Sequence, residues 1–213
     1  MLMRWSQVFL TSGYRRLRAY LRNTTFFRGT DTPEIETEKA LAFLRERQYG
    51  EALASCDRAL SVNPDHADAL FCRGKALMNL NRLSEALASY EHALALNPGS
   101  VDVLVHRGAV LSRSGQHQQA LESFERALAC NPSNALAQFN CGVVLDDLMR
   151  YEEALASYDR ALALKPDYAD ALNNSGVALE NLKRYERNNR PNAANRAEET
   201  LRTSLWQSGT RRC

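Results

Sequence analysis

The residue types best suited to catalysis or metal binding are scattered along this chain rather than clustered. The cysteines and histidines are Cys56, Cys72, Cys130, Cys141, Cys213, His66, His92, His106 and His117. They show neither the Cys-x-x-Cys nor the His-Glu-x-x-His spacing of zinc sites. An odd number of isolated cysteines is typical of a reducing compartment, where buried thiols act as small apolar side chains. We therefore expect no metal site and no cofactor.

Carboxylate pairs do not suggest acid–base catalysis either. Asp146 and Asp147 are adjacent in the sequence, as are Glu152 and Glu153, so the members of each pair diverge on a helix. The chain also lacks a glycine-rich phosphate loop and a nucleophile elbow. We predict that the protein is not an enzyme and that it has no catalytic residues.

The charge is strongly segregated along the chain. The 213 residues carry a net charge of +2, from 27 basic and 25 acidic residues. Residues 1–30 hold six bases and no acid, and residues 184–213 hold seven bases and three acids, which leaves 14 bases against 22 acids between them. No apolar run reaches the roughly 18 residues of a membrane-spanning helix. An acidic centre between basic ends bears on partners rather than on the fold.

A 34-residue repeat organises the middle of the chain. One proline, two alanines and one glycine recur at this spacing. They are Pro64, Pro98, Pro132 and Pro166; Ala52, Ala86, Ala120 and Ala154; Ala59, Ala93, Ala127 and Ala161; and Gly74, Gly108, Gly142 and Gly176, with Ala40 at the matching position of the first repeat. Such regularity indicates stacked copies of one supersecondary unit.

Each repeat has the apolar periodicity of two helices. A proline ends the second helix, because the residue before proline avoids helical backbone. The pattern predicts helices over 34–46, 50–62, 67–80, 84–96, 101–114, 118–130, 135–148, 152–164 and 169–183.

The small residues should let the paired helices approach closely. We expect Gly74 and Ala86 to face each other where their helices cross, with large side chains such as Tyr90 filling the space between the helices. Cys56 stands where the other repeats have an aromatic residue, so the first repeat should pack more loosely.

The pattern of Gly74, Ala86, Tyr90, Ala93 and Pro98 resembles the signature of the tetratricopeptide repeat. The resemblance implies an all-α, right-handed α-solenoid of stacked antiparallel helix pairs, whose first helices line a concave groove. Glu36 and Gln138 depart from the pattern, because they occupy an early position that is usually tryptophan or leucine.

The resemblance divides the chain into three segments. Residues 1–32 form a basic leader, residues 33–185 the repeat array, and residues 186–213 an Arg/Asn-rich tail. The array comprises full repeats at 33–66, 67–100, 101–134 and 135–168 and a half repeat at 169–185.

The resemblance also places a set of side chains in the groove, where they would contact a partner. They are Asp68, Phe71, Lys75, Asn79, Asp102, His106, Arg113, Phe139, Asn140, Asp146, Asn173, Asn174 and Asn181. Asn140 and Asn174 occupy the same position in successive repeats. They are similar to the asparagine ladder of O-linked N-acetylglucosamine transferases, in which side-chain amides hold an extended peptide backbone. Asparagines merely tolerated on an exposed helix are the alternative.

The charge of the groove indicates its partner. Acidic groove positions outnumber the basic ones, which are Lys75 and Arg113. The pattern of lysine, arginine and asparagine with which co-chaperone repeats bind a terminal carboxylate is absent. We expect a protein or peptide partner with a neutral or basic segment. Nucleic acid is disfavoured, because the ordered part of the chain is acidic.

The two ends leave alternatives open. In one interpretation, residues 4–22 form a basic amphipathic helix on an anionic membrane surface; in the other, the leader is a disordered segment without a structural role. The repeat stops abruptly after Glu186. In one interpretation, the tail forms a weak helix near 193–206 that caps the last repeat. In the other, it results from a frameshift or truncation of a longer array. The abrupt end of the repeat favours the second interpretation.

These observations favour a cytoplasmic protein-interaction scaffold or adaptor that binds an extended segment in its groove. One alternative is the substrate-binding part of a glycosyltransferase that lacks its catalytic domain. Another is an adaptor peripheral to the membrane through its leader.

The opposite charges of the leader and the array suggest that residues 1–30 dock within the groove and compete with partners. Deleting residues 1–30 should then raise peptide affinity most at low salt, because exposed charge pairs are screened. Affinity measured across a salt series checks this, and an unchanged salt dependence would refute it.

Overall fold

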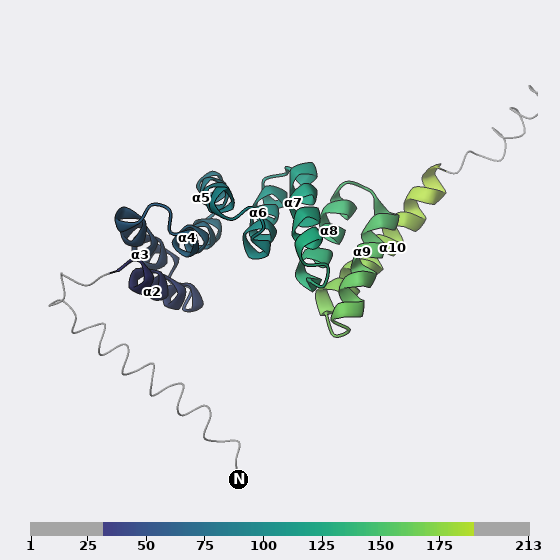
Figure 1. The fold of residues 1–213 in the computed structure, drawn as a ribbon. Helices are drawn as coiled ribbons and strands as arrows, with labels where there is room; N and C mark the ends of the chain where they lie inside the picture. Colours follow the sequence, from purple (N-terminus) through teal and green to yellow (C-terminus); the bar gives the residue numbers. More distant parts are fainter. Residues whose placement is uncertain (1–31, 190–213) are drawn as a thin grey trace, which may run out of the picture. The chain divides into compact units, whose positions relative to one another are not determined.

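The computed structural model describes residues 32–189, which are entirely helical apart from short connections. Within this range nine helices follow one another without a strand (Figure 1). They are α2 (Pro33–Arg45), α3 (Tyr49–Val62), α4 (Ala67–Asn79), α5 (Leu83–Leu96), α6 (Val101–Arg113), α7 (His117–Cys130), α8 (Ala135–Asp147), α9 (Tyr151–Leu164) and α10 (Ala169–Asn189). The predicted boundaries of all but the last helix are confirmed to within one residue. None of the nine is long and apolar enough to cross a bilayer.

The helices pack as consecutive pairs within two compact units, which divide after Pro98. In the first unit, α2 pairs with α3 and α4 with α5, and α4 also contacts α2 and α3. In the second unit, α6 pairs with α7 and α8 with α9, while α10 packs on α8 and α9. The all-α fold of stacked helix pairs is therefore confirmed.

One type of turn joins the two helices of every complete repeat. Its central residue has a positive φ in all four cases, at Arg47, Asn81, Gly115 and Met149. The next residue donates its N–H to a carbonyl five positions back, as in Arg82 N to Leu77 O at 2.9 Å. This left-handed residue with its long-range hydrogen bond is the Schellman ending of a helix, and it reverses the chain into the second helix.

The fifth repeat lacks this turn. Lys183 occupies the position that is left-handed in the other repeats, yet α10 continues through it to Asn189. The prediction that this helix ends near 183 was wrong. In the complete repeats the turn brings an apolar second helix onto the first, whereas the sequence after Glu186 has lost that helix's pattern. The predicted weak helix near 193–206 lies outside the described residues.

An aromatic ring lying against a glycine sets the closest approach within three of the pairs. A Cβ atom added to Gly74 would lie 2.3 Å from the ring of Tyr90. Gly108 has the same relation to Phe124, at 2.6 Å, and Gly142 to Tyr158, at 2.4 Å. We expected the glycine to make room for Ala86; its nearest neighbour is instead the ring one turn further along the second helix.

The first repeat uses a different pair at the same two positions. Ala40 replaces the glycine and Cys56 replaces the aromatic residue, and both are fully buried. With Cys72 they form a small core cluster against which Leu41 and Leu44 pack. A larger residue on one helix thus accompanies a smaller residue on the other.

The first repeat also buries a carboxylate. Glu36 stands where the next two repeats have leucine, and its side chain is only 2% exposed. Lys39 contacts its Oε1, and Arg58 donates from Nε to its Oε2 at 2.7 Å. These two cations offset the cost of removing the carboxylate from water.

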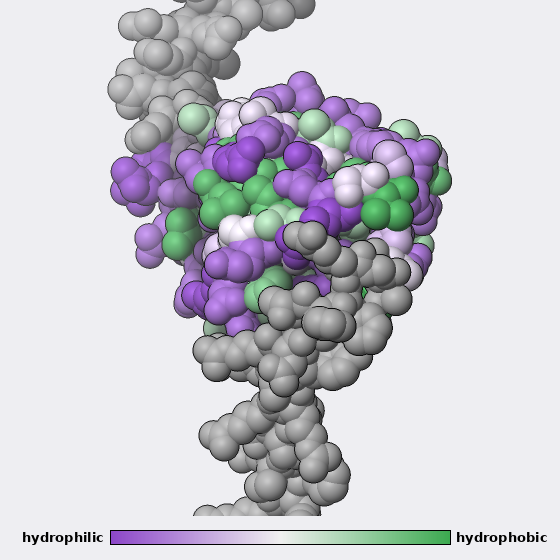
Figure 2. Space-filling view, turned by 90° about the vertical axis from the view of Figure 1, so that its left-hand side faces the viewer, coloured by the Kyte–Doolittle hydropathy of each residue, from purple (hydrophilic) through white to green (hydrophobic). Residues whose placement is uncertain are grey.

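Figure 2 views the protein from the side of α2 and α3 and shows a mostly hydrophilic face with small hydrophobic patches.

The glycine–ring contact leads to a paired prediction. Gly142→Ala should lower the free energy of unfolding by about 1–3 kcal/mol, because the Tyr158 ring must move away from the added methyl group. Gly176→Ala is the matched control: no atom lies within 4 Å of its added Cβ. This change should stabilise the helix by up to about 1 kcal/mol. Urea unfolding followed by circular dichroism measures both, and equal effects would contradict the proposed contact.

Candidate functional site

The first helices of the repeats carry all the groove residues predicted from the sequence. In the second unit, α8 contacts both α6 and α10, so their residues lie on neighbouring helices. These are Asp102, His106 and Arg113 on α6, Phe139, Asn140 and Asp146 on α8, and Asn173, Asn174 and Asn181 on α10. The remaining four, Asp68, Phe71, Lys75 and Asn79, all lie on α4 of the first unit.

Asp146, near the end of α8, is the most unusual polar residue of this set. Its Oδ1 atom is buried and accepts no hydrogen bond. Burial raises the pKa of its carboxyl group, the amide of Asn181 opposes this shift, and the charge of Asp147 adds to it. A buried carboxylate oxygen without a donor is costly, and a bound partner that offers an N–H group would remove that cost.

Aromatic side chains adjoin this carboxylate. The Phe139 ring lies between those of Tyr158 and Tyr168, with centroid distances of 6.0 and 4.9 Å. Burial raises the pKa of the Tyr158 hydroxyl, and the charge of Asp146 raises it further. A hydrogen bond with Asn174 has the opposite effect. The side chains of α8, α9 and α10 therefore form one polar and aromatic cluster within the second unit.

Some predicted residues are already engaged within their own helix. His106 donates from Nδ1 to the carbonyl of Asp102 at 2.8 Å, because a carbonyl can only accept. On α4, Asn79 donates from Nδ2 to the carbonyl of Lys75, also at 2.8 Å. The Lys75 ammonium lies 5.3 Å from the centre of the Phe71 ring. Local contacts therefore orient these three side chains.

Two residues of the cluster were missed in the sequence. Tyr158 and Tyr168 lie on the second helix and in the connection that follows it, whereas the family resemblance directs attention to the first helices. Tyr158 could have been recognised from the repeat. In the second, third and fourth repeats the aromatic residue at this position packs against a glycine of the first helix.

Three of the four cysteines in the described range are buried, and Cys130 is exposed. Burial raises the pKa of Cys72 to about 11 and that of Cys56 and Cys141 to about 12, so these thiols stay protonated at neutral pH. No three potential ligands come together as a metal site among residues 32–189.

Comparison with known families identifies the repeat. A family model described as "Tetratricopeptide repeat" matches residues 37–101, 107–168 and 145–188, and a second model with the same description matches residues 89–122. No curated protein matches the sequence.

Solved structures share the fold. A "Crystal structure of MamA protein" aligns with a TM-score of 0.64 and 21% identity over 71% of this chain and 82% of that one. A repeat protein from Parabacteroides merdae ATCC 43184 aligns at 0.63 with 22% identity, over 72% of this chain and 61% of that chain. YrrB, described as a repeat protein "with an unusual peptide-binding site", aligns at 0.62 with 25% identity over 82% and 84%.

The position of Asp146 predicts an effect on stability. Because its pKa is higher in the folded than in the unfolded chain, the ionised carboxylate destabilises the fold at neutral pH. Asp146→Asn should therefore raise the free energy of unfolding at pH 7, by less than about 1 kcal/mol, and the gain should vanish below about pH 4. Urea unfolding at both pH values tests this. Asp159→Asn is the control; it removes a carboxylate from an exposed position of α9 and should bring no gain.

Proposed function

Since this chain belongs to the tetratricopeptide repeat family, we propose that it is a protein-interaction scaffold that binds an extended segment of a partner along α6, α8 and α10. The one peptide-binding relative named above supports this type of ligand. The proposal concerns the second unit, where the unsatisfied carboxylate and the asparagines lie on adjacent helices.

The buried Oδ1 atom of Asp146 is the observation that carries this proposal. A carboxylate oxygen that is shielded from water and lacks a donor is retained at a cost to stability, which is typical of a position that serves binding. Since Oδ1 is shielded from water, a backbone N–H or a basic side chain of a partner would supply the missing donor once the side chains that cover it move. A hydrogen bond with Asn181 lowers the pKa of the same carboxyl group.

The asparagines add groups that suit a peptide backbone. Each amide offers both a donor and an acceptor, which match the C=O and N–H groups of an extended chain. Asn140 on α8 and Asn174 on α10 occupy equivalent positions one repeat apart, and both are half-buried. Contacts of this kind hold a segment with little regard to its sequence.

The charge around these amides favours a neutral or basic segment. Asp146, Asp147, Asp170 and Glu180 lie on α8 and α10, which carry no basic residue before Lys183. A partner segment with acidic residues would meet like charge, whereas a lysine or arginine would be attracted.

Selection from a random peptide library against the full chain tests the proposal. Peptides recovered should be neutral or basic. Asn140→Ala and Asn174→Ala should each weaken binding of the selected peptides by about threefold to tenfold, the loss expected from one hydrogen bond of about 1 kcal/mol. Fluorescence polarisation measures the affinities.

Gln118→Ala is the matched control, since it removes an exposed amide from the second helix α7. It should leave affinity unchanged, and circular dichroism should show that all three variants are folded. If the asparagine variants bind as tightly as the parent, or if Gln118→Ala weakens binding equally, the face formed by α6, α8 and α10 is not the binding site.

A further inference from the structure

A buried serine recurs on the second helix of every complete repeat. Ser55, Ser89, Ser123 and Ser157 are 34 residues apart and at most 4% exposed. Three of them donate their hydroxyl proton to the carbonyl four residues back, as Ser89 does to Glu85 at 2.9 Å and Ser157 to Glu153 at 3.0 Å. Their oxygen atoms therefore face the first helix as hydrogen-bond acceptors.

An arginine of the first helix uses this acceptor in two repeats. Arg73 donates from Nη1 to Ser89 Oγ at 2.7 Å and from Nε to Asp57 Oδ1 at 2.9 Å. It thereby links α4 to α5 and α3. In the third repeat, Arg107 donates from Nη1 to Ser123 Oγ, again at 2.7 Å. We call the position that Arg73 and Arg107 occupy on the first helix the arginine slot. In the second repeat it lies between Ser89 and Asp57.

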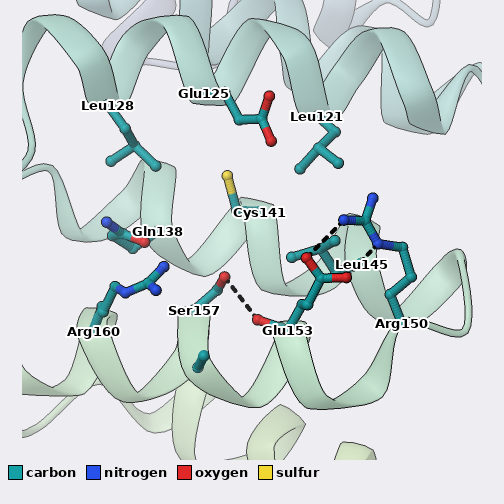
Figure 3. Close-up of a pocket in the computed structure, with 11 residues that line it drawn as sticks. Leu121, Glu125, Leu128, Gln138, Cys141, Leu145, Arg150, Glu153, Ser157 and Arg160 are labelled. Carbon is teal, nitrogen blue, oxygen red and sulfur yellow. Dashed lines mark hydrogen bonds and ion pairs between the residues drawn. The ribbon is translucent and has the colours of Figure 1, made fainter.

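In the fourth repeat the arginine slot has lost its arginine. Cys141 stands 34 residues after Arg107, and its short side chain leaves a cavity of about 180 Å³ between α7, α8 and α9 (Figure 3). The two acceptors are still present: Glu125 is the equivalent of Asp57, and Ser157 is the equivalent of Ser89. Both line the cavity.

A third acceptor has been added to the same cavity. Gln138 lines it, is only 8% exposed and has a buried Oε1 atom without a hydrogen-bond partner. In the first repeat the equivalent residue, Glu36, accepts from the guanidinium of Arg58. That guanidinium belongs to Arg58, which also donates from Nη2 to Ser55 Oγ at 2.8 Å and is the equivalent of Arg160.

We propose that this cavity binds the guanidinium group of an arginine side chain that comes from none of the surrounding helices, α7, α8 and α9. A planar guanidinium directs five N–H donors outward in one plane, which suits three separate acceptors, whereas the ammonium of lysine is a compact point charge. The chain shows this recognition in its second repeat, with a serine and a carboxylate in the equivalent positions. The cavity lies beside the second helices α7 and α9, so the inference does not rest on the proposed function.

Arg160 is the competitor for this cavity, because its equivalent in the first repeat, Arg58, donates to both Glu36 and Ser55. Arg160 itself lines the cavity, but no dashed line joins it to Gln138 or Ser157 (Figure 3). Its equivalent in the third repeat is Arg126, and there Arg107 fills the arginine slot in the presence of that second arginine. Arg150 on the rim is already paired with Glu153 at 2.7 Å.

Titration of the isotope-labelled full chain with Nα-acetyl-L-arginine amide, followed by NMR, tests the proposal. Saturable shifts should appear at amides of α7, α8 and α9 around the cavity. Nα-acetyl-L-lysine amide should bind at least about tenfold more weakly, because it cannot reach three acceptors. Equal binding of the lysine compound would overturn the proposal, since charge alone would then explain it.

Free L-arginine distinguishes the two sources of the group. Weaker binding than the blocked amide indicates an arginine within a polypeptide, because a free ammonium or carboxylate is then disfavoured at the cavity. Tighter binding indicates a small guanidino compound. Either result supports guanidinium recognition, and absence of binding by both compounds refutes it.

Four variants complete the experiment. Cys141→Arg restores the arginine of the preceding repeats, so it should fill the cavity and abolish binding without lowering thermal stability. Glu125→Gln keeps the cavity but should weaken binding at least about tenfold, because it removes the charged acceptor. Asp159→Asn makes the same charge change at an exposed residue of α9 outside the cavity and should have no effect. Binding that persists in Glu125→Gln, or that appears only after Arg160→Ala, would overturn the proposal.

Discussion

The contact between a glycine and an aromatic ring is the constraint on which the other features of these repeats depend. Because the Tyr158 ring lies where a side chain of Gly142 would be, α8 and α9 are held at a short and fixed separation. That separation brings the hydroxyl of Tyr158 to Asn174 and Asp146 on one side. On the other side it places Ser157 opposite Cys141. The polar cluster and the cavity thus share one mechanical origin, and neither requires a backbone conformation outside the repeat pattern.

Most of the fold could be predicted because it follows from local, repeated signals. The spacing of Gly74, Gly108 and Gly142, with prolines at the repeat ends, determined the helices to within a residue in all but one case. The failures have different causes. The end of α10 was misplaced although Lys183 and Tyr185 keep to the repeat, because the apolar pattern of the second helix stops only after Glu186. Cys141 is an ordinary buried thiol until its equivalents Arg73 and Arg107 are seen to bind serines. The loss of an arginine has meaning only once the acceptors left behind are located.

The two proposals together assign two distinct recognition chemistries to different helices of the second unit. Asn140, Asp146 and Asn174 belong to the first helices and suit an extended backbone, whereas Glu125 and Ser157 belong to the second helices and suit one planar cation. A scaffold with both can hold two segments at once, and the local effective concentration of one then favours the other when they belong to the same partner. The acidic residues of α8 and α10 give the first of these proposed sites a preference for basic sequences.

The exchange between Ala40 and Cys56 shows how far the repeats are interchangeable. A methyl group has been gained on one helix and a ring lost on the other, so that the two positions act as a single inherited unit. Moving only one of them into a neighbouring repeat would set alanine against an aromatic ring, or glycine against a thiol. The first combination is overfilled and the second leaves a void. The two positions, rather than either residue alone, are therefore what must be exchanged together when one of these repeats replaces another in a designed array.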